Sequence, residues 1–291
     1  MDLRRHEKAS SFLKILSMPF SNKKFVVGFM ILAGITLTAV IGDMLLTFDP
    51  LRTGRFPLSQ PPSLAHLLGT DTLGRDLFAQ LLLGIESSLT IGLIVATVST
   101  LLGATMGFIA GYYKGFVDLL IRSVTDTFIV LPLLPILILI SCLLRTISIF
   151  AMAAILCIFS WAWTARQVRS QTLSVKESDF VYMSKLSGMK GREIIFTEIM
   201  PHMLQWMIAN FINVALWAMI IEAGLEMLGL GPHNTMTLGM MLYWANLHSA
   251  MFREMWWWWA PPVIMLVLIF VSLYTISIGL DETINPRQRT R

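Results

Sequence analysis

Six long apolar segments constrain the fold of this 291-residue chain more than any other feature. They lie near residues 25–46, 89–111, 124–144, 147–164, 204–228 and 257–280. Each approaches the roughly 20 apolar helical residues that cross the hydrocarbon core of a bilayer. Only 14% of the residues are charged, whereas soluble domains average about 25%. We therefore expect an all-α polytopic membrane protein with six transmembrane helices.

The placement of lysine and arginine predicts the orientation of these spans. Six basic residues precede the first span and six lie in the loop 165–203, against three in the loop 47–88 and one in the loop 229–256. The positive-inside rule then places both termini and the loops 112–123 and 165–203 in the cytoplasm. The predicted organisation is a cytoplasmic N-terminal segment (1–24), a transmembrane domain (25–280) that includes the loop 165–203, and a cytoplasmic tail (281–291).

The first segment is too long for a cleaved signal peptide. The apolar core of such a peptide spans about 7–15 residues, whereas this segment runs from about 25 to 46 and ends near Asp43, Phe48 and Asp49. We expect it to remain as an uncleaved span.

Small residues recur every four positions in the second segment, at Ser99, Gly103, Gly107 and Gly111. Such a spacing lines them up on one face of a helix, where the backbone of a second helix can approach closely. We expect this face to pack against a neighbouring span.

Two prolines interrupt the third segment, at Pro132 and Pro135. A proline inside a helix has no N–H to donate, so it frees backbone carbonyls and bends the helix. The sequence therefore predicts a bent third span.

Polar residues in the fifth segment fall on the helix itself rather than at its ends. Glu222 and Glu226 are four residues apart and share a face, and Asn210 and Asn213 lie nearer the middle of the span. Ionisable groups in a membrane span usually face a bundle interior or an aqueous cavity. These four residues are our candidates for a translocation pathway, although for the two asparagines we favour hydrogen bonding between helices over contact with a ligand.

The loops expected outside the cell carry two further features. Asp71, Arg75 and Asp76 read as a charged turn that satisfies itself, in preference to a solute contact. The run Trp256–Trp259 heads the last span, and tryptophan prefers the boundary between water and lipid. We expect these tryptophans to form an interfacial belt.

The chain lacks the sequence patterns of enzymes that would suit a membrane protein. There is no GxxxxGK[ST] loop, no HExxH pair and no GxSxG elbow. We expect no catalytic residue, no metal site and no cofactor on this chain, and we read its net charge of +4 as orientation rather than nucleic-acid binding. A channel or an ion-coupled carrier remains compatible with polar spans and broken helices.

The loop 165–203 reads as two short helices joined by a corner. A helical pattern runs from Ser178 to Leu186, Gly188 interrupts it, and a second pattern runs from Arg192 to Met200. Pro201 is expected to mark the turn back to the membrane. A protruding helical corner of this kind suits a partner protein that binds a helix in a groove.

This loop resembles the EAA loop of ABC importer permeases, whose pattern is EAAxxxG followed about nine residues later by an I-x-P ending. The matching positions are Gly188, Ile194, Ile195, Phe196, Ile199 and Pro201. At the triad that names the motif, Tyr182, Met183 and Ser184 stand for Glu, Ala and Ala.

Four ordered stretches are similar to the C-type permease of the dipeptide, oligopeptide and nickel importer family. They are HLLGTDTLGRD at 66–76, GYYKGFVD at 111–118, EAGLEMLGLG at 222–231, and GLDETINPR at 279–287. In the third stretch, Glu226 stands where the family has serine.

The resemblance implies a type I ABC importer permease in the plasma or inner membrane of a prokaryote. It implies four partners besides lipid: a homologous B-type permease, two cytosolic ATPases that hold ATP and magnesium, and an extracytoplasmic solute-binding protein. The solute would be a peptide, although members of the family also carry oligosaccharides, nickel or metal chelates. The residues expected to couple to the ATPases are Tyr182, Ser184, Lys185, Gly188, Arg192 and Glu193.

Overall fold

The structure is a computed structural model that describes residues 20, 22–143 and 147–284. The expectations for the first nineteen residues and for the end of the tail, including the last part of the stretch 279–287, lie outside these residues. The elements are α2 (Lys23–Leu45), α3 (Leu77–Tyr113), α4 (Gly115–Val130), α5 (Leu133–Leu143), α6 (Ile149–Val175), α7 (Asp179–Leu186), α8 (Gly191–Ile194), the π-helix η2 (Ile195–Ile199), α9 (Met200–Met227), α10 (Leu238–Leu247) and α11 (Trp256–Ile284).

The all-α expectation is confirmed for the described ranges, in which no strand occurs beyond one isolated bridge between Thr70 and Asp76. Five helices are long and apolar enough to cross a membrane, and the bent pair of α4 and α5 raises the number to six if it forms one span. Five to six spans agree with the six predicted from the apolar segments.

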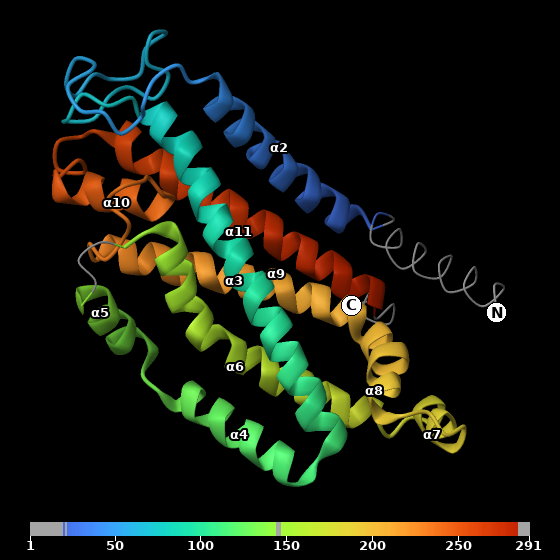
Figure 1. Cartoon of the computed structure of the whole chain (residues 1–291). Helices are drawn as coiled ribbons and strands as arrows, with labels where there is room; N and C mark the ends of the chain where they lie inside the picture. Colours follow the sequence, from blue (N-terminus) through green and yellow to red (C-terminus); the bar gives the residue numbers. More distant parts are fainter. Residues whose placement is uncertain (1–19, 21, 144–146, 285–291) are drawn as a thin grey trace.

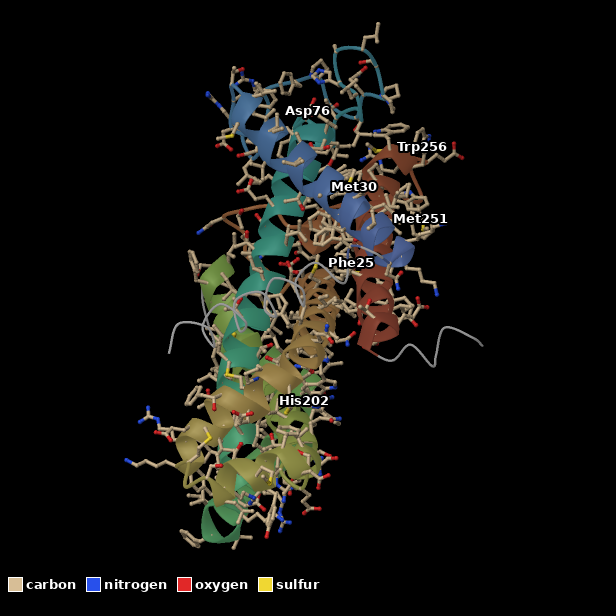
Figure 2. The ribbon with its side chains drawn as sticks, turned by 90° about the vertical axis from the view of Figure 1, so that its right-hand side faces the viewer. Phe25, Met30, Asp76, His202, Met251 and Trp256 are labelled. Atoms are coloured by element: carbon tan, nitrogen blue, oxygen red, sulfur yellow. The ribbon has the colours of Figure 1, made fainter. Side chains whose placement is uncertain are left out.

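The long helices run between two distinct ends of the molecule (Figure 1). At one end, here named the loop end, lie the segment 46–76 and α10. At the other, here named the elbow end, lie α7 and α8. Helix α3 packs along α6 and α9, and α2 packs along α11. Figure 2 shows the two ends from another side, with Asp76 near the loop end and His202 near the elbow end.

Helices α3 and α6 each extend more than ten residues beyond one end of the apolar segments that predicted them. Helix α3 begins at Leu77 instead of near residue 89, because the Asp76 side chain caps it by accepting a hydrogen bond from the Ala79 backbone N–H at 2.9 Å. Helix α6 continues to Val175 instead of ending near 164, since Val168 and Thr172 are buried against other helices. The added parts of both helices contain polar residues. A search for uninterrupted apolar runs therefore makes both helices too short.

The predicted bend in the third span is confirmed. Helices α4 and α5 meet at 80° across Leu131 and Pro132. Pro135 falls in the first turn of α5, where its missing N–H has no partner within the helix to lose.

The expectation that the chain turns at Pro201 is wrong. A continuous helical run of 37 residues extends from Gly191 to Met227 and includes Pro201. Pro201 cannot donate a hydrogen bond to the carbonyl of Thr197, and the π-helix η2 lies just before it, where Met200 N–H donates to the carbonyl of Ile195. The wider turn lets the helix pass the proline without a break.

The small-residue face of α3 packs closely on α6, as predicted. A methyl group built on Gly103 would lie 2.6 Å from Thr164 Cβ, and one built on Gly107 would lie 2.6 Å from Val168 Cβ. Ser99 Oγ continues the same face and forms a hydrogen bond with the hydroxyl of Ser160. Because the residues on this face of α3 are glycine or serine, the two helices can lie close together.

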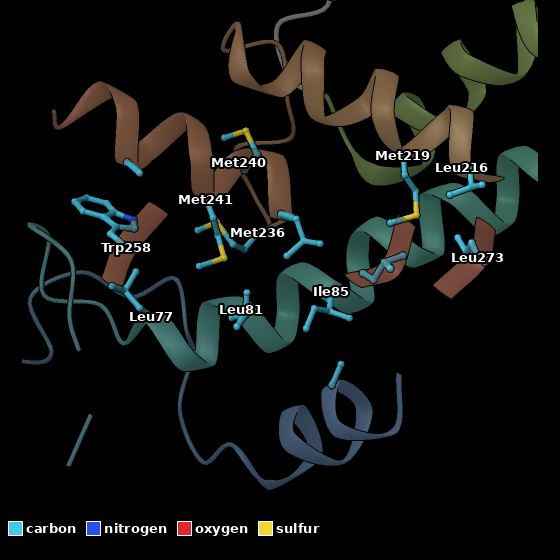
Figure 3. Close-up of a cluster of buried hydrophobic side chains, with 14 of the residues drawn as sticks. Leu77, Leu81, Ile85, Leu216, Met219, Met236, Met240, Met241, Trp258 and Leu273 are labelled. Carbon is cyan, nitrogen blue, oxygen red and sulfur yellow. The ribbon is translucent and has the colours of Figure 1, made fainter. Parts of the chain in front are cut away.

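The predicted tryptophan belt is only partly right. Trp256 is 57% exposed, but Trp258 is completely buried in the apolar core of the loop end, which Figure 3 shows. The Trp258 ring stacks on the His248 ring with centroids 5.7 Å apart. Four consecutive residues of a helix point in different directions, so the run cannot lie entirely at a lipid boundary.

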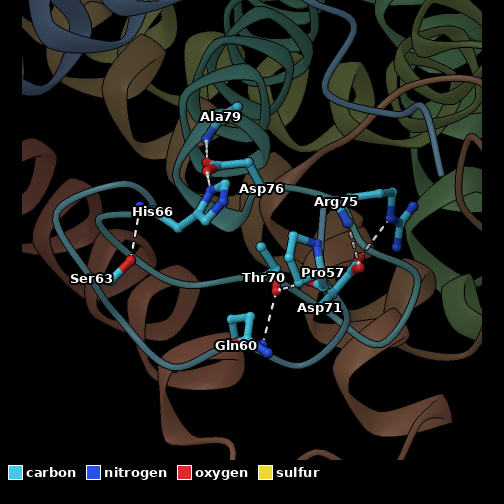
Figure 4. A network of polar contacts seen from close by, with 9 residues as sticks. All are labelled: Pro57, Gln60, Ser63, His66, Thr70, Asp71, Arg75, Asp76 and Ala79. Atoms are coloured by element: carbon cyan, nitrogen blue, oxygen red, sulfur yellow. Dashed lines mark hydrogen bonds and ion pairs between the residues drawn. The ribbon is translucent and has the colours of Figure 1, made fainter. Parts of the chain in front are cut away.

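The charged turn of the loop end satisfies most of its own polar groups, as predicted (Figure 4), although Arg75 Nη2 is buried without a hydrogen-bond partner among the described residues. Arg75 Nε donates to Asp71 Oδ2 at 2.6 Å, and Asp71 Oδ1 accepts hydrogen bonds from the backbone N–H groups of Leu73 and Arg75. Asp76 caps α3 and contacts His66 Nδ1 at 2.8 Å. Asp71 and Arg75 are almost fully buried, so this turn fixes the segment 66–76 onto the end of α3.

Candidate functional site

The corner formed by α7 and α8, residues 179–194, is here named the elbow. It is anchored to the long helices by two buried side chains, Val181 of α7 and Ile194 of α8, neither of which is exposed to solvent. Both belong to an apolar cluster that includes Phe108 of α3 and Val168 of α6. A closely packed interior transmits displacement rather than absorbing it, so a force on the elbow would reach α3, α6 and α9 together.

A lysine at the base of the elbow adds a polar anchor. The Lys176 ammonium, just beyond the end of α6, donates a hydrogen bond to the carbonyl of Tyr112 at the end of α3. Partial burial lowers the pKa of Lys176, and the nearby positive charges of Lys114 and Lys185 lower it further. The contact ties the elbow to the end of α3.

Gly188 forms the corner because α7 ends in a motif that needs a left-handed residue. Its φ is 78°. Gly188 N–H donates to the carbonyl of Lys185, and Met189 N–H donates to the carbonyl of Ser184, at 3.0 and 3.2 Å. These two bonds define a Schellman motif, in which the residue after the helix cap is usually glycine. No heavy atom lies within 4 Å of a methyl group built on Gly188, so its role lies in the backbone.

The outer face of α7 exposes apolar side chains. Tyr182, Met183 and Leu186 are 61%, 61% and 66% exposed. Three adjacent exposed apolar groups on a short helix are typical of a surface that another protein covers. Sequence reasoning named Tyr182 but missed Met183 and Leu186, although Tyr182 and Leu186 have the i, i+4 spacing of one helix face.

The other predicted coupling residues lie around this face in less prominent roles. Ser184 Oγ donates to the carbonyl of Phe180 at 3.0 Å, and Glu193 caps α8 by accepting a hydrogen bond from the Lys190 N–H at 3.1 Å. Lys185 and Arg192 are exposed, and the Lys185 ammonium lies 5.9 Å from the centre of the Tyr112 ring. The elbow thus brings all six predicted residues into one projection, but only some of them face outward.

The four predicted pathway residues separate into two groups. Asn210 and Asn213 line a cavity of about 380 Å³ between α6 and α9. The Asn210 amide donates a weak hydrogen bond to Thr164 Oγ1 at 3.4 Å. Asn210 and Asn213 are therefore the predicted pathway residues whose side chains line an open cavity.

Glu222 and Glu226 are buried elsewhere, between α3, α9 and α10. Glu222 is 1% exposed and accepts a hydrogen bond from Ser88 Oγ at 3.0 Å, while Glu226 is 0% exposed and accepts one from Thr237 Oγ1. Ser88 Oγ in turn accepts a hydrogen bond from the Leu238 N–H at the start of α10. The two carboxyl groups therefore hold α10 to the bundle and are closed off from solvent in this conformation.

The architecture defines the class of protein: a polytopic helical membrane protein with a rigid, partly apolar elbow at one end and a closed, hydrogen-bonded loop structure at the other. The family model described as "Binding-protein-dependent transport system inner membrane component" matches residues 103–290. The chain belongs to this family and is a permease component of a binding-protein-dependent ABC importer.

The alignments with three permease proteins each cover most of the chain. It is 32% identical over 232 residues to the oligopeptide transport system permease protein OppC of Lactococcus lactis subsp. cremoris, an alignment that covers 79% of each chain. It is 32% identical over 236 residues to OppC of Mycobacterium tuberculosis, covering 80% of each. A putative peptide transport system permease protein of Brucella abortus is 31% identical over 270 residues, covering 91% of this chain and 88% of the relative.

Proposed function

We propose that this chain forms one half of the membrane pathway of a peptide importer and receives the energy of ATP hydrolysis through the elbow. The observation that carries this proposal is the exposed apolar face of α7 on a corner that is packed into three long helices. Such a face suits a groove on a partner protein. The names of the relatives, which are oligopeptide and peptide permeases, support a peptide as the solute.

The family supports a different partner for each end of the molecule. Two ATPases, which hold ATP and magnesium, bind at the elbow end in the cytoplasm, and we propose that both termini face the same side of the membrane. A solute-binding protein docks at the loop end on the opposite side of the membrane. A homologous second permease completes the pathway. The excess of basic residues in the loop 165–203 supports this orientation.

The residues of the elbow contribute to coupling in different ways. Tyr182 contributes apolar contact area to the ATPase, and Arg192 and Lys185 offer exposed positive charge. Gly188 sets the angle between α7 and α8, while Ser184 and Glu193 hold the ends of the two helices. A movement of the ATPases would therefore displace the elbow as one body and change the relative positions of α6 and α9.

The family argues against the alternative that the sequence alone left open, an ATP-independent channel or an ion-coupled carrier. Such a protein has no need of a cytosolic partner, so it would carry solute in vesicles that contain this chain alone. Flux of a peptide through such vesicles without ATP would favour the alternative.

Photo-crosslinking tests the proposed partner at the elbow. A benzophenone amino acid replaces Tyr182 in the full importer, and the control carries the same group at Leu64, which is fully exposed at the loop end. We expect irradiation to join position 182, and not position 64, to the ATPase. Crosslinking of position 182 only to the solute-binding protein, or of neither position to the ATPase, would overturn the proposal.

A further inference from the structure

The cavity between α6 and α9 is lined by polar side chains. The packing of the helices against one another does not explain why these side chains are polar. Its polar side chains include Thr164 and Gln167 on α6 and Asn210 and Asn213 on α9, and the indoles of Trp163 and Trp217 flank them. On each helix the lining positions follow the spacing i, i+3, i+4, i+7, which marks a single helix face. A face of α6 that carries polar and tryptophan side chains therefore lies opposite a similar face of α9 across the cavity.

Two of the three carboxamides that line the cavity lack hydrogen-bond partners among the described residues. Gln167 and Asn213 are exposed, and neither side chain makes a hydrogen bond to another residue in the part of the chain that the structure describes. An amide without a hydrogen-bond partner costs several kcal/mol in hydrocarbon. Asn213 lies inside the predicted span 204–228, so lipid cannot cover its side chain without that cost.

A second cavity on α9 provides the contrast. It is lined by apolar side chains such as Leu216, Met219, Leu266 and Phe270 and contains no polar side chain. Lipid chains can cover such a surface at no electrostatic cost. The two cavities therefore suit different environments, one apolar and one polar.

We infer that the α6–α9 cavity is the site where this chain contacts the transported solute, and that it binds the amide backbone of a peptide without reading side-chain charge. The inference rests on the proposed import function and adds the chemistry of recognition. No Asp, Glu, Lys or Arg lines the cavity. Carboxamides both donate and accept hydrogen bonds, as each peptide unit of a solute does.

The two flanking indoles add apolar surface and N–H donors to the cavity. Trp163 is 53% exposed and Trp217 is partly buried, and each presents a broad apolar face beside one N–H donor. Such faces cover apolar parts of a peptide of any sequence. A wall of this composition holds every peptide weakly, which suits passage rather than storage.

The test uses the full importer in proteoliposomes with ATP and its binding protein. The probes are three pentapeptides that differ only in a central Ala, Lys or Glu, together with maltotriose as an uncharged sugar. The variants are Asn213→Leu and Gln167→Leu, each of which removes the polar group at similar volume. The control is Ile208→Ala, an exposed position on the same helix that does not line the cavity. Gel filtration checks that each importer assembles.

We expect each variant to lower uptake of all three peptides by the same factor, about fivefold, the equivalent of one net hydrogen bond, while Ile208→Ala leaves uptake unchanged. Unchanged uptake in both assembled variants would overturn the inference and indicate that the partner permease covers this face. Different factors for the Lys and Glu peptides would overturn the claim of charge indifference. Loss of maltotriose uptake alone would overturn the peptide class. If the unaltered importer carries no peptide, the proposed function itself fails.

Discussion

Replacing Gly107 by alanine tests whether the packing of α3 on α6 depends on small residues. A Cβ at this position would lie 2.6 Å from Val168 Cβ and 2.7 Å from the carbonyl oxygen of Ala165. Ordinary carbon contacts are about 3.5–4.0 Å. Both neighbouring atoms belong to or adjoin the backbone of α6, so neither can rotate away, and the helices must separate by about 1 Å.

Overpacking of this kind typically costs about 1–3 kcal/mol. We therefore expect Gly107→Ala to lower the melting temperature of the purified importer by several degrees, measured by thermal unfolding in detergent. Gly34→Ala on α2 is the control, since no heavy atom lies within 4 Å of a methyl group built there. If Gly107→Ala and Gly34→Ala melt at the same temperature, the small-residue face does not set the helix spacing.

Three further substitutions test the polar contacts. Asp71→Asn leaves the buried Arg75 guanidinium without a charged partner, and we expect a loss of about 3–5 kcal/mol, seen as a reduced yield of assembled importer. Arg169→Gln breaks two contacts to Asp118, at 2.5 and 2.7 Å; because both groups are partly exposed we expect only about 1 kcal/mol, measured by urea unfolding. Glu226→Gln removes one of two neighbouring buried carboxyl groups and keeps an acceptor oxygen, so we expect an unchanged or raised melting temperature, and a fall of several degrees would contradict this.

The sequence predicted the number and type of the membrane helices because crossing a bilayer imposes a length and a composition. It failed where a helix continues past its apolar run. The start of α3 at Leu77 depends on the Asp76 cap, and the passage of α9 through Pro201 depends on the π-helix before it. Hydropathy carries neither signal. Hydropathy also does not distinguish a side chain that faces lipid from one buried in protein, so it could not predict that Trp258 is buried.

The elbow was readable as a unit because Gly188 and the two helical patterns lie within one short stretch. The cavity was not, although polar and tryptophan residues occupy i, i+3, i+4 and i+7 from Ser160, and i, i+3 and i+7 from Asn210, with Val214 at i+4. Their meaning depends on α6 and α9 facing each other, which is a tertiary contact. Likewise, the pairing of Glu222 with Ser88 joins residues 134 positions apart.

Uptake per ATP hydrolysed in a Gly188→Val importer is the most direct test of the claim that the elbow transmits the energy. Valine is strongly disfavoured at positive φ, and the open surroundings of Gly188 confine the distortion to the corner. The control is Gly54→Val at the loop end, where φ is 70° and the surroundings are also open. We predict continued ATP hydrolysis with a several-fold lower uptake per ATP for Gly188→Val alone. An uptake per ATP equal to that of the unaltered importer would contradict the account.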